Sequence, residues 1–271
     1  MVFGLLGAAC LGYLGLCALV YARQPSLVFF PSREVRLTPA DVGLAYEEWW
    51  IRTEDGLTLH AWAIQNPACD SWVLHCHGNG GNIAGRISHL QLFRSLGLNA
   101  VIFDYRGYGK SEGTPRDEEG LLRDAEAVWR KLTLEREIPP AKIVLMGESL
   151  GGGVAAALAE RHRPAGLILH STFTSLPDRG AEIYPFLPVR LLSRIRLDTL
   201  GRVRGLDCPK LFVHGREDEV IPFHHGLRLY EAAAEPKRWL EVPGGHNSSP
   251  LQLGEEFRLA LGQFVIDACR P

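Results

Sequence analysis

The 271-residue chain lacks an excess of charge of either sign. Its 29 basic and 31 acidic residues leave a formal charge of −2 at pH 7, and no run of like charges exceeds a few residues. Proteins that bind nucleic acid carry a basic excess that meets the phosphates, so we expect no nucleic-acid partner. Without a basic arm or an acidic tail, the common charged interaction tails are excluded as well.

The sequence also has no internal repeat and no low-complexity tract. Hydrophobic residues make up 46% and charged residues 22% of the chain, which is ordinary for a globular protein. This composition excludes a disordered, collagen-like or coiled-coil protein. A chain of this length buries roughly 75% of the surface of its unfolded form, so its core needs neither disulfides nor a metal.

Motifs for zinc, disulfide frameworks and phosphate loops are missing. The chain has six cysteines, Cys10, Cys17, Cys69, Cys76, Cys208 and Cys269. They form no CxxC pair, so we expect free thiols. The run His75-Cys76-His77 has no companion cluster, and GxxxxGK[ST] is absent. We therefore expect no metal and no nucleotide or other cofactor.

Residues 1–22 contain no charged side chain. As a helix they would extend about 33 Å, which matches a hydrocarbon core of about 30 Å, and a helix satisfies its own backbone polar groups. We interpret the segment as a retained single-pass membrane anchor. A cleaved signal peptide, leaving a secreted or periplasmic protein, stays open because Val20-Tyr21-Ala22 resembles a cleavage site, although a basic n-region is missing. A buried core helix is disfavoured, because nothing polar marks a solvent face.

Residues 23–47 contain prolines and no helix or strand periodicity, and we interpret them as a membrane-proximal connector. Within them, the apolar run Leu27–Pro31 is expected to lie along the membrane surface. Arg23, Arg33 and Arg36 follow the apolar segment and no Lys or Arg precedes it, which favours a cytoplasmic C-terminal domain.

Strand-like and helix-like segments alternate through residues 48–271, which we predict to be one domain. The runs Glu48–Thr53 and Leu57–Ile64 flank an acidic-glycine turn and predict an antiparallel hairpin. Further strands are expected at Ser71–His75, Asn99–Phe103, Lys142–Met146, Leu167–His170, Lys210–His214 and Arg238–Val242. Helices are expected at Ile83–Leu96 (capped by Asn82), Asp117–Leu134, Leu150–Arg161, Gly226–Ala234 and Glu255–Cys269. This order predicts a largely parallel α/β sheet covered on both faces, interrupted by an insertion at about 176–203.

The sequence Gly147-Glu148-Ser149-Leu150-Gly151 is a G-x-S-x-G motif between a predicted strand and a predicted helix, which is the context that the motif requires. A serine on a sharp strand-to-helix turn has strained dihedral angles, so the residues two positions away must be small. Ser149 is therefore the candidate nucleophile.

A serine hydroxyl needs a base to remove its proton. His246 follows the last predicted strand in a glycine-flanked loop that leaves it free to reach across the sheet edge, and we take it as the base. Other histidines are assigned elsewhere: His75, His170 and His214 end predicted strands and are expected to be satisfied structural residues, while His224 and His225 are expected to be solvated.

The base in turn needs a carboxylate that holds its tautomer. The loop after Lys210–His214 carries three acids, and Asp218, three residues past a glycine, is best placed beside the sheet. Glu217 and Glu219 are expected to be surface charges. Acyl transfer also needs backbone amides for the oxyanion. We expect these from Leu150, directly after the nucleophile, and from Asn79 in a glycine-rich turn.

The order Ser149, Asp218, His246 resembles that of the α/β-hydrolases, whereas the chymotrypsin and subtilisin orders do not fit. The run Asp104–Ser111 is similar to the D-x-R-G-x-G-x-S turn that follows the fourth strand of that superfamily. The resemblance covers the chain from about Glu48 to the C-terminus. It implies an α/β-hydrolase fold with an eight-stranded-type sheet and the catalytic and oxyanion roles given above.

More narrowly, the run His77–Asn82, together with residues 214–218 and 245–247, is similar to a membrane-anchored branch with one N-terminal hydrophobic segment. That branch includes acyl-protein thioesterases. Ser248 departs from the family, where an acid is common at this place. The insertion at about 176–203 implies a modest cap that is too small to enclose a large substrate by itself.

Together these features predict a serine hydrolase that cleaves carboxylic esters or thioesters through an acyl-enzyme. A small-molecule or lipid-like acyl substrate is expected, since the anchor would hold the site beside such molecules. Two alternatives stay open: a serine peptidase of the same fold, and a hydrolase-fold binding protein without activity.

Overall fold

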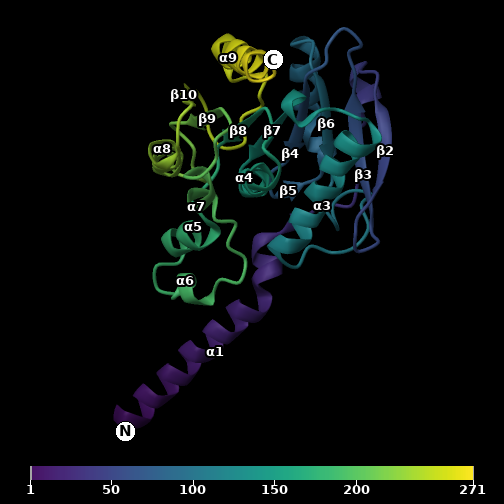
Figure 1. The fold of residues 1–271 in the computed structure, drawn as a ribbon. Coiled ribbons are helices and arrows are strands. Elements are labelled where there is room, and N and C mark those ends of the chain that lie inside the picture. Colours follow the sequence, from purple (N-terminus) through teal and green to yellow (C-terminus); the bar gives the residue numbers. More distant parts are fainter. Residues whose placement is uncertain (1, 271) are drawn as a thin grey trace.

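A computed structural model describes residues 2–270 (Figure 1). Its central sheet has the strand order β10-β9-β8-β7-β4-β6-β3-β2. The strands are β2 (Glu47–Arg52), β3 (Thr58–Ile64), β4 (Trp72–Cys76), β6 (Asn99–Phe103), β7 (Ile143–Glu148), β8 (Gly166–His170), β9 (Lys210–Gly215) and β10 (Lys237–Val242). The pairs β2–β3 and β3–β6 are antiparallel and all other neighbours are parallel. The predicted α/β fold, with its N-terminal hairpin, is confirmed.

Helices cover both faces of this sheet. They are α2 (Ile87–Ser95), α3 (Glu118–Arg130), α4 (Leu150–His162), α7 (Thr199–Val203), α8 (Phe223–Ala232) and α9 (Gly254–Ala268). Residues of α3, α4, α7 and α8 join the hydrophobic core on one face, and residues of α2 and α9 join the core on the other. Alternate residues of the central strands point to opposite cores, as Val73 and Leu74 do, which is why these strands are apolar throughout.

Helix bounds agree with the sequence prediction to within a few residues, with two local differences. The helix expected from Ile83 begins as a 3-10 turn, Ile83–Arg86, before α2, and the Asn82 side chain caps it by accepting from the Ala84 amide. The helix expected to reach Leu134 is α-helical only as far as Arg130 and continues as a short π-helix over Lys131–Glu135.

The apolar N-terminal segment forms α1 (Val2–Val28), which projects from the rest of the molecule (Figure 1). Among the described residues it is the helix long and apolar enough to cross a membrane, and nearly all of its apolar window is exposed. A buried core helix is therefore wrong. The helix also continues past residue 22, and Phe29 is buried rather than lying along a membrane surface. The two residues after Phe29, Phe30–Pro31, form β1, which pairs with β5 (Gly80–Gly81).

The predicted insertion lies between β8 and β9 and forms α5 (Leu176–Ile183), α6 (Val189–Leu192) and α7. It lies on the same side of the molecule as α1, whereas α9 lies on the opposite side (Figure 1). All six cysteines are free thiols, as predicted.

Candidate active site

Ser149 lies at the turn between β7, which ends at Glu148, and α4, which begins at Leu150. Its backbone has φ 52° and ψ −118°, a strained conformation for a residue with a side chain. The turn is held by two hydrogen bonds: the Ser149 amide donates to the His170 carbonyl (3.0 Å), and the Thr172 hydroxyl donates to the Ser149 carbonyl (2.6 Å). The strand-turn-helix context that the motif requires is thus present.

The two motif glycines are required by close backbone contacts. A Cβ atom at Gly147 would lie 2.4 Å from the carbonyl oxygen of Gly151. A Cβ atom at Gly151 would lie 2.0 Å from the carbonyl oxygen of Cys76, at the end of β4. Both distances are far inside van der Waals contact, so larger residues would displace the turn.

His246 lies within hydrogen-bond distance of both Ser149 and Asp218, and we call these three residues the Ser149 group. The Nε2 atom of His246 is 3.0 Å from the Ser149 Oγ. Its Nδ1 atom is 2.8 Å from Oδ2 and 3.0 Å from Oδ1 of Asp218. Asp218 follows β9 and His246 follows β10, so neighbouring parallel strands deliver both side chains to the same sheet edge.

The surroundings of Asp218 stabilise its ionised form. Its side chain is fully buried, and Oδ1 accepts hydrogen bonds from the amides of Val220 and Ile221. Burial acts to raise the pKa of Asp218, but the hydrogen bond and charge of His246 together with the Ile221 amide hold that pKa below its usual value. The group therefore contains a carboxylate that faces the Nδ1 side of His246.

The two acids beside Asp218 differ from each other. Glu217 is exposed, as predicted for a surface charge. Glu219 accepts a hydrogen bond from the His246 backbone amide (3.1 Å). Glu219 is also exposed, as predicted for a surface charge, and its carboxylate in addition helps to hold the loop that carries His246.

The glycine-rich turn after β4 lies beside Ser149. A Cβ atom at Gly78 would lie 3.5 Å from the Ser149 Cβ. The next residue, Asn79, uses its side-chain oxygen to accept from the Phe30 amide and from the Tyr108 hydroxyl, both at 3.2 Å. The strand β1, which follows α1, is thus hydrogen-bonded to the turn predicted to hold the oxyanion.

The structure confirms the predicted surroundings of one histidine and contradicts those of several others. His214 is satisfied, as predicted, since its ring bonds to the Ile221 carbonyl (2.8 Å). The ring of His75 is buried with no hydrogen-bond partner on either nitrogen, and His170 lacks a partner at Nδ1. His225, predicted to be solvated, is buried between Thr174 and Glu182, because the insertion folds over α8.

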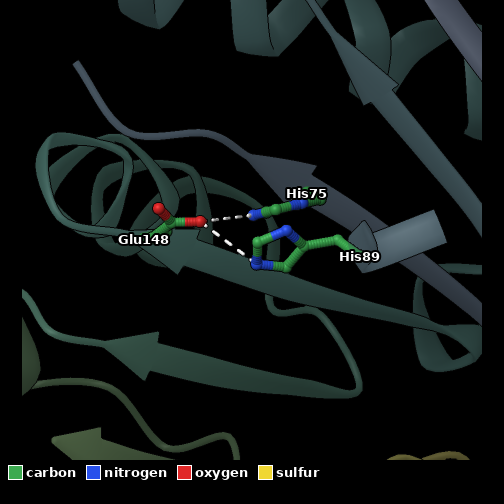
Figure 2. A group of neighbouring side chains, drawn as sticks. All are labelled: His75, His89 and Glu148. Atoms are coloured by element: carbon green, nitrogen blue, oxygen red, sulfur yellow. Dashed lines mark ion pairs between the residues drawn. The ribbon is translucent and has the colours of Figure 1, made fainter. Parts of the chain in front are cut away.

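His75, His89 and Glu148 form a second cluster, which we call the buried histidine group (Figure 2). The Oε2 atom of Glu148 is 3.1 Å from Nε2 of His89 and 3.7 Å from Nε2 of His75. Oε1 of the same carboxylate is 3.5 Å from Nε of Arg86. Sequence reasoning missed this group, because it combines two strand ends with a helix residue 14 positions from His75.

The charge of the buried histidine group is fixed by its burial and by Arg86. Burial, followed by the neighbouring His89, places the pKa of His75 well below its usual value. Burial acts to raise the pKa of Glu148, but Arg86 and His89 hold it well below the usual range. The group therefore consists of a carboxylate balanced by a guanidinium, with neutral His75 beside it.

Among residues 2–270, two clusters present three ligand atoms each that lie close enough for a metal ion: the buried histidine group and an outer set of Glu182, His224 and His225. In the buried histidine group, Arg86 already balances the only carboxylate, so a divalent cation would add net positive charge to a buried site. The donor set thus fits a salt-bridged network better than a metal centre.

A parallel sheet that presents a strained serine, a histidine and a carboxylate at one edge defines an α/β-hydrolase architecture. A family model described as "Serine aminopeptidase, S33" matches residues 67–200. The chain is 35% identical over 275 residues to the α/β hydrolase domain-containing protein WAV2 of Arabidopsis thaliana, covering 92% of this chain and 89% of that protein. The chain therefore belongs to the α/β-hydrolase family.

Two further similarities extend this result. An uncharacterised membrane protein of Saccharomyces cerevisiae is 36% identical over 225 residues, covering 80% of this chain and 79% of that protein. An esterase of Pyrococcus furiosus has the same fold, with a TM-score of 0.75 at 23% sequence identity, covering 89% of this chain and 98% of that one.

Proposed function

We propose that the protein is a serine hydrolase that cleaves carboxylic esters or thioesters through an acyl-enzyme. Ser149 Oγ attacks the acyl carbonyl while His246 Nε2 takes its proton and then returns it to the leaving group. Asp218 holds the His246 tautomer and stabilises the imidazolium. The observation that carries the proposal is the continuous hydrogen-bonded path from Ser149 to Asp218.

The amides of Leu150 and Asn79 are proposed to hold the oxyanion. Leu150 opens α4, so its amide is one of the helix donors that lack an intrahelical acceptor. Asn79 lies in the turn next to Ser149, and its side chain is anchored by Phe30 and Tyr108. With the side chain held in this way, the backbone amide of Asn79 is the group proposed to meet the oxyanion.

We propose α1 as a single-pass membrane anchor and acylated, lipid-like molecules as the substrate class. The apolar span of α1 is exposed along almost its full length, which water disfavours and a bilayer favours. The strand β1 directly after α1 is bonded to the Asn79 turn, and this supports a site held close to the membrane surface. The yeast relative named as a membrane protein supports this placement.

The test uses the full chain in detergent with a fluorophosphonate probe, which labels activated serines. The wild type should be labelled and Ser149→Ala should not. Ser95→Ala, at the end of α2, serves as a matched control and should be labelled like the wild type. A folded wild type that is never labelled would overturn the proposal.

Substrate class is tested by rates on p-nitrophenyl esters of increasing chain length and on the matching acyl thioesters. We expect rates to be maintained or to rise as the acyl chain lengthens. A sharp fall beyond acetyl or butyryl would contradict a lipid-like substrate, while leaving the hydrolase mechanism intact.

A serine aminopeptidase is a second candidate, favoured by the description of the matching family model. Such an enzyme would cleave aminoacyl arylamides at rates comparable to esters. Ester turnover without arylamide turnover would exclude it. If neither esters nor arylamides are cleaved and the probe does not label the protein, the chain is a binding protein without activity.

A further inference from the structure

The tip of the insertion, Ile183–Leu192, carries apolar side chains that the other described residues leave exposed. Leu191 is 86% exposed and Phe186 is 63% exposed, and Ile183 and Tyr184 beside them are about half exposed. A domain in water seldom gathers large apolar side chains in this way unless they meet a partner.

This tip is joined to α1 by specific polar contacts. The Tyr13 hydroxyl donates to the Phe186 carbonyl at 2.8 Å. The Gln24 amide group donates to the Leu192 carbonyl, and its oxygen accepts from the Arg194 amide at 2.7 Å. The tip is therefore held against α1, on the side of the molecule away from α9 (Figure 1).

The contacts fix how far along α1 the tip reaches. Tyr13 precedes Ala22 by nine residues, which is about 13 Å along a helix. Half of a hydrocarbon core of about 30 Å is about 15 Å, so Phe186 would lie in the half of the bilayer nearest Ala22, close to the bilayer centre, if residues 2–22 span it. We propose that the tip Ile183–Leu192 is a second membrane-binding surface, which inserts into the same leaflet as α1. The proposal rests on the proposed function only through α1 as a membrane span.

Most N–H groups of the tip are paired, which suits lipid because each unpaired polar group there costs several kcal/mol. Pro185 and Pro188 carry no N–H group at all. The following N–H groups donate within the insertion: Tyr184, Leu187, Val189, Leu191, Leu192 and Ser193. The carbonyls of Phe186 and Leu192 are satisfied by polar side chains of an otherwise apolar helix. In water, solvent molecules would hydrogen-bond to these two carbonyls, so the side chains of Tyr13 and Gln24 would not be needed to satisfy them.

Charges near the tip are placed as an interface requires. The Arg194 guanidinium lies 4.8 Å from the centre of the Tyr21 ring, and exposed Arg23 lies at the same level of α1. Cations and tyrosines at this level meet lipid headgroups. Arg190 lies within the tip itself, where it is paired with Asp178 at 3.0 Å, so its charge is balanced.

Insertion depth is measured with the full chain in vesicles that contain lipids brominated in their acyl chains. Phe186→Trp adds a fluorophore at the tip, and Leu259→Trp adds one on α9, where residue 259 is 55% exposed. We expect the bromolipids to quench the emission that Phe186→Trp adds and to leave that of Leu259→Trp unchanged. Vesicle flotation confirms that the chain is in the bilayer.

Two outcomes overturn the proposal. A chain that floats with the vesicles but shows no quenching at position 186 has an anchor without a second surface. A chain that does not float has no anchor, and the proposal falls with it. Probe labelling of Ser149 is independent of both, so the hydrolase function is judged separately.

Activity provides a second readout. Phe186→Asp combined with Leu191→Asp should lower hydrolysis of an ester embedded in the bilayer roughly tenfold, because carboxylates resist insertion. Hydrolysis of a dissolved short-chain ester by this double variant should stay unchanged. In the control variant Leu259→Asp, hydrolysis of both the embedded and the dissolved ester should stay unchanged. Unchanged hydrolysis of the embedded ester would overturn the proposal. If both rates fall together, the quenching result decides.

Discussion

The Ser149 group and the buried histidine group both combine histidine with a carboxylate, and they meet at the same turn of the chain. In the Ser149 group, both nitrogens of His246 have partners at 3.0 Å or less. In the buried histidine group, the rings of His75 and His89 have no hydrogen-bond partner that meets ordinary geometry. Similar residues thus make two different kinds of site.

The difference indicates what each group can do. A hydrogen-bonded chain that ends on a serine can transfer a proton, since the donor, base and carboxylate are already aligned. A buried carboxylate opposite a guanidinium can only hold a charge in place. We infer that Glu148 and Arg86 keep the end of β7 rigid, while the neighbouring residue Ser149 carries the chemistry.

The largest effect that separates the two groups is expected from Asp218→Asn. An amide can keep the shape of the site but holds the wrong tautomer of His246, so kcat should fall by about 10⁴-fold. Hydrolysis of a short p-nitrophenyl ester measures it. Glu217→Gln, one residue away and exposed, is the control and should leave kcat unchanged. Equal, small losses in both variants would contradict the role of Asp218.

His170 connects the two groups and predicts how stability depends on pH. Burial, with the nearby positive charges of His89, His214 and His246, lowers the pKa of His170 to about 4, although Glu148 opposes this. The unfolded chain has a pKa of about 6.5 at this residue, so between these values it binds more protons than the folded chain. The stability contribution is therefore complete above about pH 6.5 and is lost as the pH falls toward 4.

The change amounts to roughly 3 kcal/mol for one such histidine. Urea unfolding of the full chain in detergent at pH 7 and pH 4 measures it. His170→Gln should lose less stability than the wild type over this interval, by up to that amount. His224→Gln, whose side chain is half exposed, should follow the wild type. Parallel curves for all three proteins would show that His170 does not titrate as described.

A smaller effect is expected from Glu148→Gln, which removes the charge of the buried histidine group. Arg86 and His89 would lose a charged partner, which costs about 1–3 kcal/mol of unfolding free energy. Because Glu148 does not touch the reacting atoms, kcat should fall less than tenfold. Glu160→Gln, on an exposed part of α4, is the matched control. A loss of kcat as large as that of Asp218→Asn would erase the distinction between the groups.

The sequence was sufficient to predict the Ser149 group because its signals are local. A strained turn needs glycines at 147 and 151, and each partner follows a recognisable strand. The buried histidine group has no such signal. His89 is one of several polar residues of α2, and only the packing of α2 against the sheet brings it to His75 and Glu148.

For the insertion, too, the sequence predicted the position in the chain but not the contacts that the segment makes. Its Pro, Leu and Arg composition broke the strand-helix alternation and so predicted where it lies. Its contact with α1 depends on single polar residues, Tyr13 and Gln24, in an apolar helix. Their partners are backbone atoms about 170 positions away, which carry no residue-type signal.

The smallest effect is expected at Asn79 and sharpens the description of the Ser149 group. If this residue acts through its backbone amide, Asn79→Ala keeps the proposed donor and removes only the side-chain bonds to Phe30 and Tyr108. Each such bond contributes about 1 kcal/mol, so kcat should fall only a few-fold. Tyr108→Phe, which removes one of the two bonds, should have a smaller effect still. A loss of a hundredfold or more in Asn79→Ala would instead assign the oxyanion contact to the side chain, because that is the usual cost of removing an oxyanion donor.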